Sequence, residues 1–164
     1  MRSRPNPSAF TLIELLLVLA ILAIIVAIVA PKLRGFTVGR ATNNTASNIL
    51  AMTHYARTQA VVEGRTYRLN YDPNAKSLYL TYENAGAITA PGSDFGSPLT
   101  IADGISLDTD IPKQTDGQYI EFHATGRTDP AIIKLTDSFG STIAVQCASP
   151  TEAFRILEGS EVPK

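Results

Sequence analysis

The chain has 164 residues, with fourteen basic and fifteen acidic side chains and a formal net charge of −1. About 130 residues follow an N-terminal apolar run, which is enough for one domain with its own core but too few for two. Residues 35–164 hold ten basic and fourteen acidic side chains and no run of Lys or Arg, which argues against a phosphate-binding surface. The single cysteine, Cys147, excludes an intrachain disulfide and is interpreted as a small core residue.

The first predicted element is an apolar helix from Phe10 to Ala30. Its twenty-one residues are interrupted only by Thr11 and Glu14. At about 1.5 Å per residue they span roughly 30 Å, the thickness of a bilayer core. A carboxylate in that position is costly, so Glu14 predicts a function and a partner that neutralises its charge. Pro31 lacks a backbone donor and predicts a kink.

Three interpretations of this run remain open. A secretory signal peptide has a shorter apolar region, and a cut between Ala30 and Pro31 is unfavourable. A plain transmembrane anchor explains the length of the run but leaves Glu14 unexplained. The third interpretation is a resemblance to a known family, carried by the residues around Phe10.

The motif Ala9-Phe10-Thr11-Leu12-Ile13-Glu14 resembles the processing site of type IV prepilins and type II secretion pseudopilins. The resemblance implies that residues 1–9 are a leader, that a prepilin peptidase cuts between Ala9 and Phe10, and that the new amino group of Phe10 is methylated. Glu14 then becomes the fifth residue and Pro31 the twenty-second, as in that family. Ala9 departs from the family's usual glycine.

A buried carboxylate is tolerated when it meets a cation. The mature amino group of Phe10, in the same or a neighbouring subunit, is such a cation. We therefore expect Glu14 to set the register of assembly. The simpler alternative is an interfacial glutamate that reaches the lipid headgroups.

Apolar residues recur at helical spacing again between Arg40 and Glu63, and Gly64 is a typical residue after a helix end. The predicted buried stripe consists of Ala46, Ile49, Met52, Ala56 and Ala60. Residues 10–63 are thus expected to form one long helix, with 10–30 in the membrane and the second half packed on a domain formed by residues 64–164.

Beyond Gly64 the apolar period changes to two, which is typical of strands. The predicted strands are Thr66–Tyr71, Ser77–Glu83, one or two within Leu99–Leu107, Gln118–Ala124, Ala131–Leu135, Ser141–Ala148 and Ala153–Leu157. Hairpin turns are expected at 72–76 and 137–140. In the predicted strand Gln118–Ala124, the inward positions are Tyr119 or Ile120, Phe122 and Ala124. Residues 84–98 are expected to be a long loop and a variable binding surface.

A long helix followed by six or seven short strands predicts an α+β fold with antiparallel sheet. The helix end Ala56-Arg57-Thr58-Gln59-Ala60 before Gly64, and the segment Tyr119–Arg127, resemble H-type pseudopilins and FimT-type minor pilins. The resemblance implies a minor pseudopilin near the tip of a type II secretion pseudopilus, with a single inner-membrane span and a periplasmic domain. The implied partners are the prepilin peptidase, the major pseudopilin, other minor pseudopilins and the inner-membrane assembly platform.

Two other functions are alternatives to this interpretation. A FimT-like minor pilin of a type IV pilus, acting in pilus assembly or DNA uptake, needs a basic surface. Residues 141–164 hold only Arg155 and Lys164 as bases, against three glutamates, so nucleic acid is not expected as a partner. A membrane-anchored enzyme or sensor would leave Glu14 incidental, and the sequence offers no catalytic constellation for it.

We expect no enzyme activity, cofactor or metal. Neither His54 nor His123 has a His, Cys or Glu at metal-ligand spacing, and both are interpreted as surface or partly packed residues. The acidic side chains of residues 103–116 lack the order of a calcium loop and favour a solvated loop. Arg57 is interpreted either as functional or as a helix-end side chain that lies over the sheet edge or pairs with a carboxylate.

Overall fold

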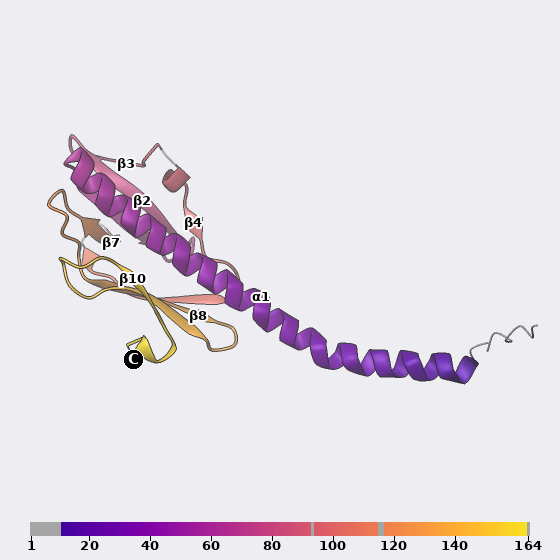
Figure 1. Ribbon diagram of the computed structural model, residues 1–164. Helices are drawn as coiled ribbons and strands as arrows, with labels where there is room; N and C mark the ends of the chain where they lie inside the picture. Colours follow the sequence, from indigo (N-terminus) through magenta and orange to yellow (C-terminus); the bar gives the residue numbers. More distant parts are fainter. Residues whose placement is uncertain (1–10, 93, 115–116, 164) are drawn as a thin grey trace, which may run out of the picture. The chain divides into compact units, whose positions relative to one another are not determined.

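The computed structural model describes residues 11–92, 94–114 and 117–163. These residues contain one long helix, ten strands and two short 3₁₀ helices, η1 (Asp94–Gly96) and η2 (Gly159–Glu161) (Figure 1). The chain divides into two compact units, Met1–Thr37 and Val38–Lys164. The helix, α1 (Leu12–Glu63), has residues in both units, and its backbone is helical through Pro31. The kink expected at Pro31 stays a prediction.

In the first unit, the described side chains of α1 are apolar almost throughout and exposed in the isolated chain. The large apolar side chains from Leu12 to Ile28 have exposed fractions between 42% and 77%. A helix that is apolar on all sides requires apolar surroundings. Within the described residues, no helix is both long enough and apolar enough to cross a membrane.

The second unit contains two antiparallel sheets, which confirms the predicted α+β class. The first sheet has the order β3-β2-β1-β7-β6, and β4 also pairs with β2. Its strands are β1 (Tyr67–Asp72), β2 (Ser77–Asn84), β3 (Ala87–Thr89), β4 (Leu99–Thr100), β6 (Lys113–Gln114) and β7 (Gly117–Phe122). The second sheet has the order β10-β9-β8-β5, formed by β5 (Ile105–Asp110), β8 (Ala131–Asp137), β9 (Thr142–Cys147) and β10 (Arg155–Glu158).

One hydrophobic core joins the second half of α1 to both sheets. All five members of the predicted helix stripe lie in it, with exposed fractions of 0–3%, so that prediction is confirmed. Three of the five are alanines, which allow the helix backbone to lie close to the strands. The first sheet contributes Tyr67, Leu69, Leu78, Leu80, Ile120 and Phe122, and the second contributes Ala131, Ile133, Leu135, Ile143, Val145 and Cys147.

Both predicted hairpin turns are confirmed, and each is held by an aspartate. In the β1–β2 turn, Asp72 Oδ1 accepts hydrogen bonds from the backbone N–H groups of Asn74 (2.8 Å) and Ala75 (3.1 Å). In the β8–β9 turn, Asp137 Oδ1 accepts them from Phe139 (2.8 Å) and Ser141 (2.9 Å). Such side chain-to-backbone bonds are why aspartate favours turns.

The segment 84–98 is not simply a loop, because it contains β3 and η1. Ala85 (φ 50°) and Gly86 (φ 83°) form a two-residue turn that pairs Asn84 with Ala87. Consecutive positive φ values are typical of tight hairpin turns. The described residues therefore hold more strands than the six or seven expected, since β3, β4 and β6 are too short to show an alternating pattern.

The inward position predicted for Ala124 is wrong. Strand β7 ends at Phe122, and the chain turns at once, so Ala124 is exposed. Ile120 and Phe122 are fully buried on the core face, while Tyr119 lies on the opposite face of the sheet.

We predict that Phe122→Ala lowers the free energy of unfolding by about 3–5 kcal/mol, because a fully buried phenylalanine leaves a cavity when truncated. Phe139→Ala is the matched control, since Phe139 is 61% exposed and its loss should cost less than about 0.5 kcal/mol. Urea unfolding of the full chain in detergent measures both values. Equal effects of the two substitutions would contradict this core.

Candidate functional site

Glu14 lies in the first turn of α1, where its carboxylate is exposed in the isolated chain. Its backbone N–H donates to Thr11 Oγ1 (3.3 Å) and Thr11 O (3.1 Å). Thr11 is therefore the N-cap, and the pattern Thr-x-x-Glu is that of a capping box. A negative charge in the first turn also interacts favourably with the helix dipole. These local roles exist beside the assembly role that the sequence predicts.

The structure describes the other predicted site residues only in part or not at all. Ala9 and Phe10, the predicted cleavage and methylation positions, lie outside the described residues. For Pro31, only the helical backbone is described. Their roles therefore stay predictions.

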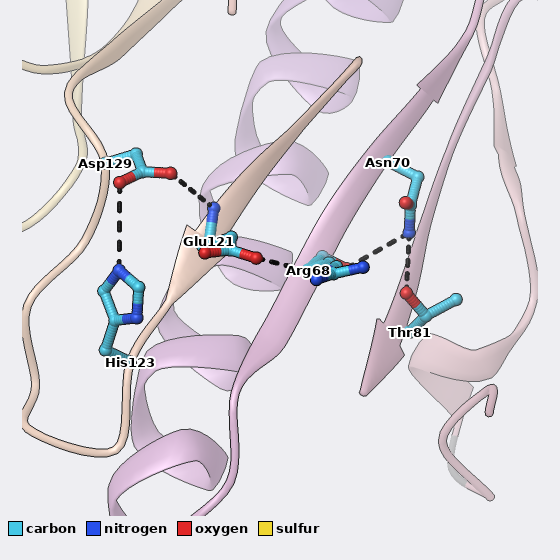
Figure 2. A network of polar contacts seen from close by, with 6 residues as sticks. All are labelled: Arg68, Asn70, Thr81, Glu121, His123 and Asp129. Atoms are coloured by element: carbon cyan, nitrogen blue, oxygen red, sulfur yellow. Dashed lines mark hydrogen bonds and ion pairs between the residues drawn. The ribbon is translucent and has the colours of Figure 1, made fainter. Parts of the chain in front are cut away.

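A polar network covers the face of β1, β2 and β7 that points away from the core (Figure 2). The strand register places Arg68 between Thr81 on β2 and Glu121 on β7. Arg68 Nε donates to Glu121 Oε1 at 3.0 Å, and its guanidinium lies 4.5 Å from the centroid of the Tyr119 ring. Asn70 Nδ2 donates to Thr81 Oγ1 at 2.9 Å. The network thus fixes the side chain of Glu121 from one side.

On its other side, Glu121 lies next to His123 and Asp129 (Figure 2). Glu121 N–H donates to Asp129 Oδ2 (3.2 Å), and Asp129 N–H donates to the Glu121 carbonyl (3.0 Å). His123 Nε2 is 3.8 Å from Asp129 Oδ1. A ligand atom from each of the three residues lies within 4.8 Å of the other two.

This cluster corrects the prediction that His123 has no potential metal ligand near it. Glu121 precedes His123 by two residues, so the sequence alone places these two members of the cluster near each other. Asp129 was missed because its approach depends on the turn in which His123 N–H donates to the Arg127 carbonyl (2.9 Å) and Gly126 N–H to the His123 carbonyl (2.8 Å). His54, in contrast, is exposed on α1, as expected.

The comparisons with known proteins bear on both units. Residues 4–30 match the family model described as a prokaryotic N-terminal methylation motif. This match encloses Ala9, Phe10 and Glu14. No curated protein matches the chain.

Solved structures resemble the chain at low sequence identity. One structure of the minor pseudopilin EpsH from the type 2 secretion system of Vibrio cholerae has a TM-score of 0.63 and 14% identity, and the match covers 73% of this chain and 98% of EpsH. A second EpsH structure gives 0.63 and 12%, with 76% and 98% covered. The type IV minor pilin FimU of Pseudomonas aeruginosa gives 0.52 and 17%, with 77% and 93% covered. At these identities the likeness is one of fold.

This chain has a type IV pilin-like fold. It combines an N-terminal methylation motif with the α+β fold of these minor subunits. The similar structures are of pilus and pseudopilus subunits rather than enzymes.

In the second unit, Arg57 joins α1 to the segment between β9 and β10. Its guanidinium donates to the backbone carbonyls of Thr151 (3.0 Å) and Glu152. The sequence predicts that a structural Arg57 lies over the sheet edge or pairs with a carboxylate. In the structure it donates hydrogen bonds to two backbone carbonyls of a loop instead. A charged donor to two carbonyls contributes more than a neutral hydrogen bond.

Cys147 lies beneath the same loop and is 1% exposed, which confirms that it is a core residue. Its Sγ lies 3.1 Å from the Ser149 carbonyl and 3.5 Å from the Glu152 carbonyl. Burial raises the pKa of the Cys147 thiol above its usual value. Less thiolate forms at a given pH, so the buried thiol is unreactive while the loop stays closed.

We predict that Arg57→Gln makes Cys147 react about tenfold faster with a water-soluble disulfide reagent, because losing the charged hydrogen bonds lets the loop open more often. Arg155→Gln is the control, since Arg155 is exposed on β10 and should leave the rate unchanged. Stopped-flow absorbance of the released thiolate gives the rates. Unchanged reactivity in Arg57→Gln would show that the arginine does not hold this loop closed.

Proposed function

We propose that this protein is a minor pseudopilin, an assembly subunit near the tip of a type II secretion pseudopilus. The observation that carries the proposal is the methylation motif on residues 4–30, followed in the same chain by a domain with the EpsH fold. In this proposal residues 10–30 form a single inner-membrane span, residues 64–164 lie in the periplasm, and the protein takes part in protein secretion. Its activity is mechanical rather than catalytic.

Processing is the first step of the proposed function. A prepilin peptidase removes residues 1–9 by cutting between Ala9 and Phe10, and the new amino group of Phe10 is methylated. The match of the motif model to residues 4–30 supports this step. The small side chain of Ala9 takes the place that glycine has in the resembling family.

We predict that the mature chain begins with N-methylated phenylalanine at Phe10. Intact-mass and N-terminal mass spectrometry of the protein from its native membrane measure this. Ala9→Gly is a matched variant that restores the family's residue and should be processed at least as completely. A chain that keeps Met1, or one cut after Ala30, would refute the assignment.

Assembly is the second step. The apolar side chains of α1 from Leu12 to Ile28 are exposed in the isolated chain, so they can pack against lipid and then against the helices of other subunits. A charge among them requires a partner of opposite sign. The amino group of a mature Phe10, in the same or a neighbouring subunit, supplies that charge and aligns the incoming subunit. The proposed neighbours are the major pseudopilin, other minor pseudopilins and the inner-membrane assembly platform.

We predict that Glu14→Ala and Glu14→Gln both remain in the membrane fraction but no longer co-purify with partner subunits. The two variants separate charge from capping, because glutamine can complete a capping box but cannot pair with an ammonium group. Co-purification after cross-linking, read by mass spectrometry, measures incorporation. Normal incorporation of Glu14→Gln alone would make Glu14 a helix cap, and normal incorporation of Glu14→Ala would remove its role in assembly.

A minor pilin of a type IV pilus is the second candidate. It is favoured by the fold similarity to FimU, although the TM-score is lower than for EpsH. The proteins recovered with the wild-type chain in the same cross-linking experiment distinguish the two, since they would be secretion subunits in one case and pilus subunits in the other.

A further inference from the structure

Glu121, His123 and Asp129 bring an imidazole and two carboxylates together at the end of β7 (Figure 2). All three residues are partly buried, with exposed side-chain fractions of 22%, 39% and 29%. They are therefore open to solvent on one side and held by the sheet on the other. Imidazole with carboxylate is a donor set that binds divalent transition metals, whereas calcium and magnesium prefer oxygen ligands alone.

The backbone holds the three residues in place without a ligand. Glu121 and Asp129 exchange two hydrogen bonds, one from Glu121 N–H to the Asp129 side chain and one from Asp129 N–H to the Glu121 carbonyl. The tight turn between them begins with the bond from His123 N–H to the Arg127 carbonyl. Little backbone order would have to be created when an ion binds.

The separations suit a tetrahedral ion. Bonds of about 2.0–2.2 Å to nitrogen and oxygen place neighbouring ligand atoms about 3.3–3.6 Å apart. His123 Nε2 and Asp129 Oδ1 are 3.8 Å apart, and all three ligand atoms are within 4.8 Å. Small side-chain rotations close the remaining distance.

Arg68 orients the third ligand. It donates to Glu121 Oε1 and so holds the carboxylate in place, and a carboxylate accepts through both of its oxygens. Ligating carboxylates are commonly held by such a hydrogen bond from an outer side chain. With one arginine and two carboxylates, the local charge is close to −1 when the histidine is neutral, which favours a divalent cation.

We propose that Glu121, His123 and Asp129 form a three-ligand site for a divalent transition metal ion such as Zn²⁺, with its fourth position open to solvent. The bound ion fastens the end of β7 to the turn that follows it. The inference depends on the folded β domain alone and is independent of the proposed role in secretion.

The test uses the full chain in detergent, purified through a tag without histidine and stripped with a chelator. We expect titration calorimetry to show one Zn²⁺ bound per chain. Since the ion binds the folded state, Tm should rise by about 5–10 °C when free zinc is near 100 times Kd. Co²⁺ should give the visible absorption of a four-coordinate ion.

His123→Gln should weaken zinc binding by at least about tenfold and abolish the Co²⁺ absorption, while the partly exposed position leaves folding intact. Asp129→Asn should act in the same direction. His54→Gln is the matched control, because it removes the chain's other histidine from an exposed helix position and should bind zinc as the wild type does. Zinc binding that persists in His123→Gln, or calcium binding of equal strength, would overturn the site.

Discussion

The exposed apolar surface of α1 is the constraint on which the rest of the molecule depends. From Leu12 to Ile28 the large apolar side chains are exposed on all sides of the helix, and this segment has no polar face along its length. Further along the same helix, from Ala46 to Ala60, a narrow stripe is completely buried against the sheets. One helix thus has two different surfaces. The second can be satisfied within the chain, whereas the first needs lipid or other helices.

Glu14 is the one charged residue in the apolar first part of α1, from Leu12 to Ile28, and it lies in the first turn. It is the third residue of a helix capped by Thr11, and its negative charge near the helix start interacts favourably with the helix dipole. That effect is modest and holds for an exposed helix end. Within a bundle of apolar helices the same carboxylate loses its water, and only a cation offsets that cost. The helix dipole therefore explains why a glutamate is tolerated in the isolated chain, and burial in an assembly would explain why a charge is used at all.

Much of the fold could be predicted from periodicity alone. The stripe of Ala46, Ile49, Met52, Ala56 and Ala60 follows from helical spacing, and both aspartate-held hairpins follow from alternation and turn residues. Strand β3 cannot be predicted in this way, because its three residues are too few to show an alternating pattern. Alternation predicts Ala124 on the core face because it does not reveal where a strand stops, and here the chain leaves β7 after Phe122.

The polar face of the first sheet was less predictable, for a physical reason. Arg68 meets Glu121, 53 residues further along the chain, because β1 pairs with β7, and sequence alone does not give the register of that pair. Asp129 reaches Glu121 through a turn held by backbone hydrogen bonds, and a bond from Glu121 N–H to the Asp129 side chain then fixes the pair. The N-terminal motif is the opposite case. It is defined by the spacing of residues within one short segment, so it can be recognised from the sequence alone.

The pairing of arginines within the domain also bears on the choice of partner. Arg57 is bonded to carbonyls of the β9–β10 loop, and Arg68 is held between Glu121 and Tyr119. Arg65 lies 5.5 Å from the ring centroid of Tyr82. Guanidinium groups that are committed to carbonyls, carboxylates and rings contribute less to a field that attracts phosphate. Acidic side chains also outnumber basic ones beyond residue 34, so these arginines agree with the expectation that nucleic acid is not a partner, which stays a prediction.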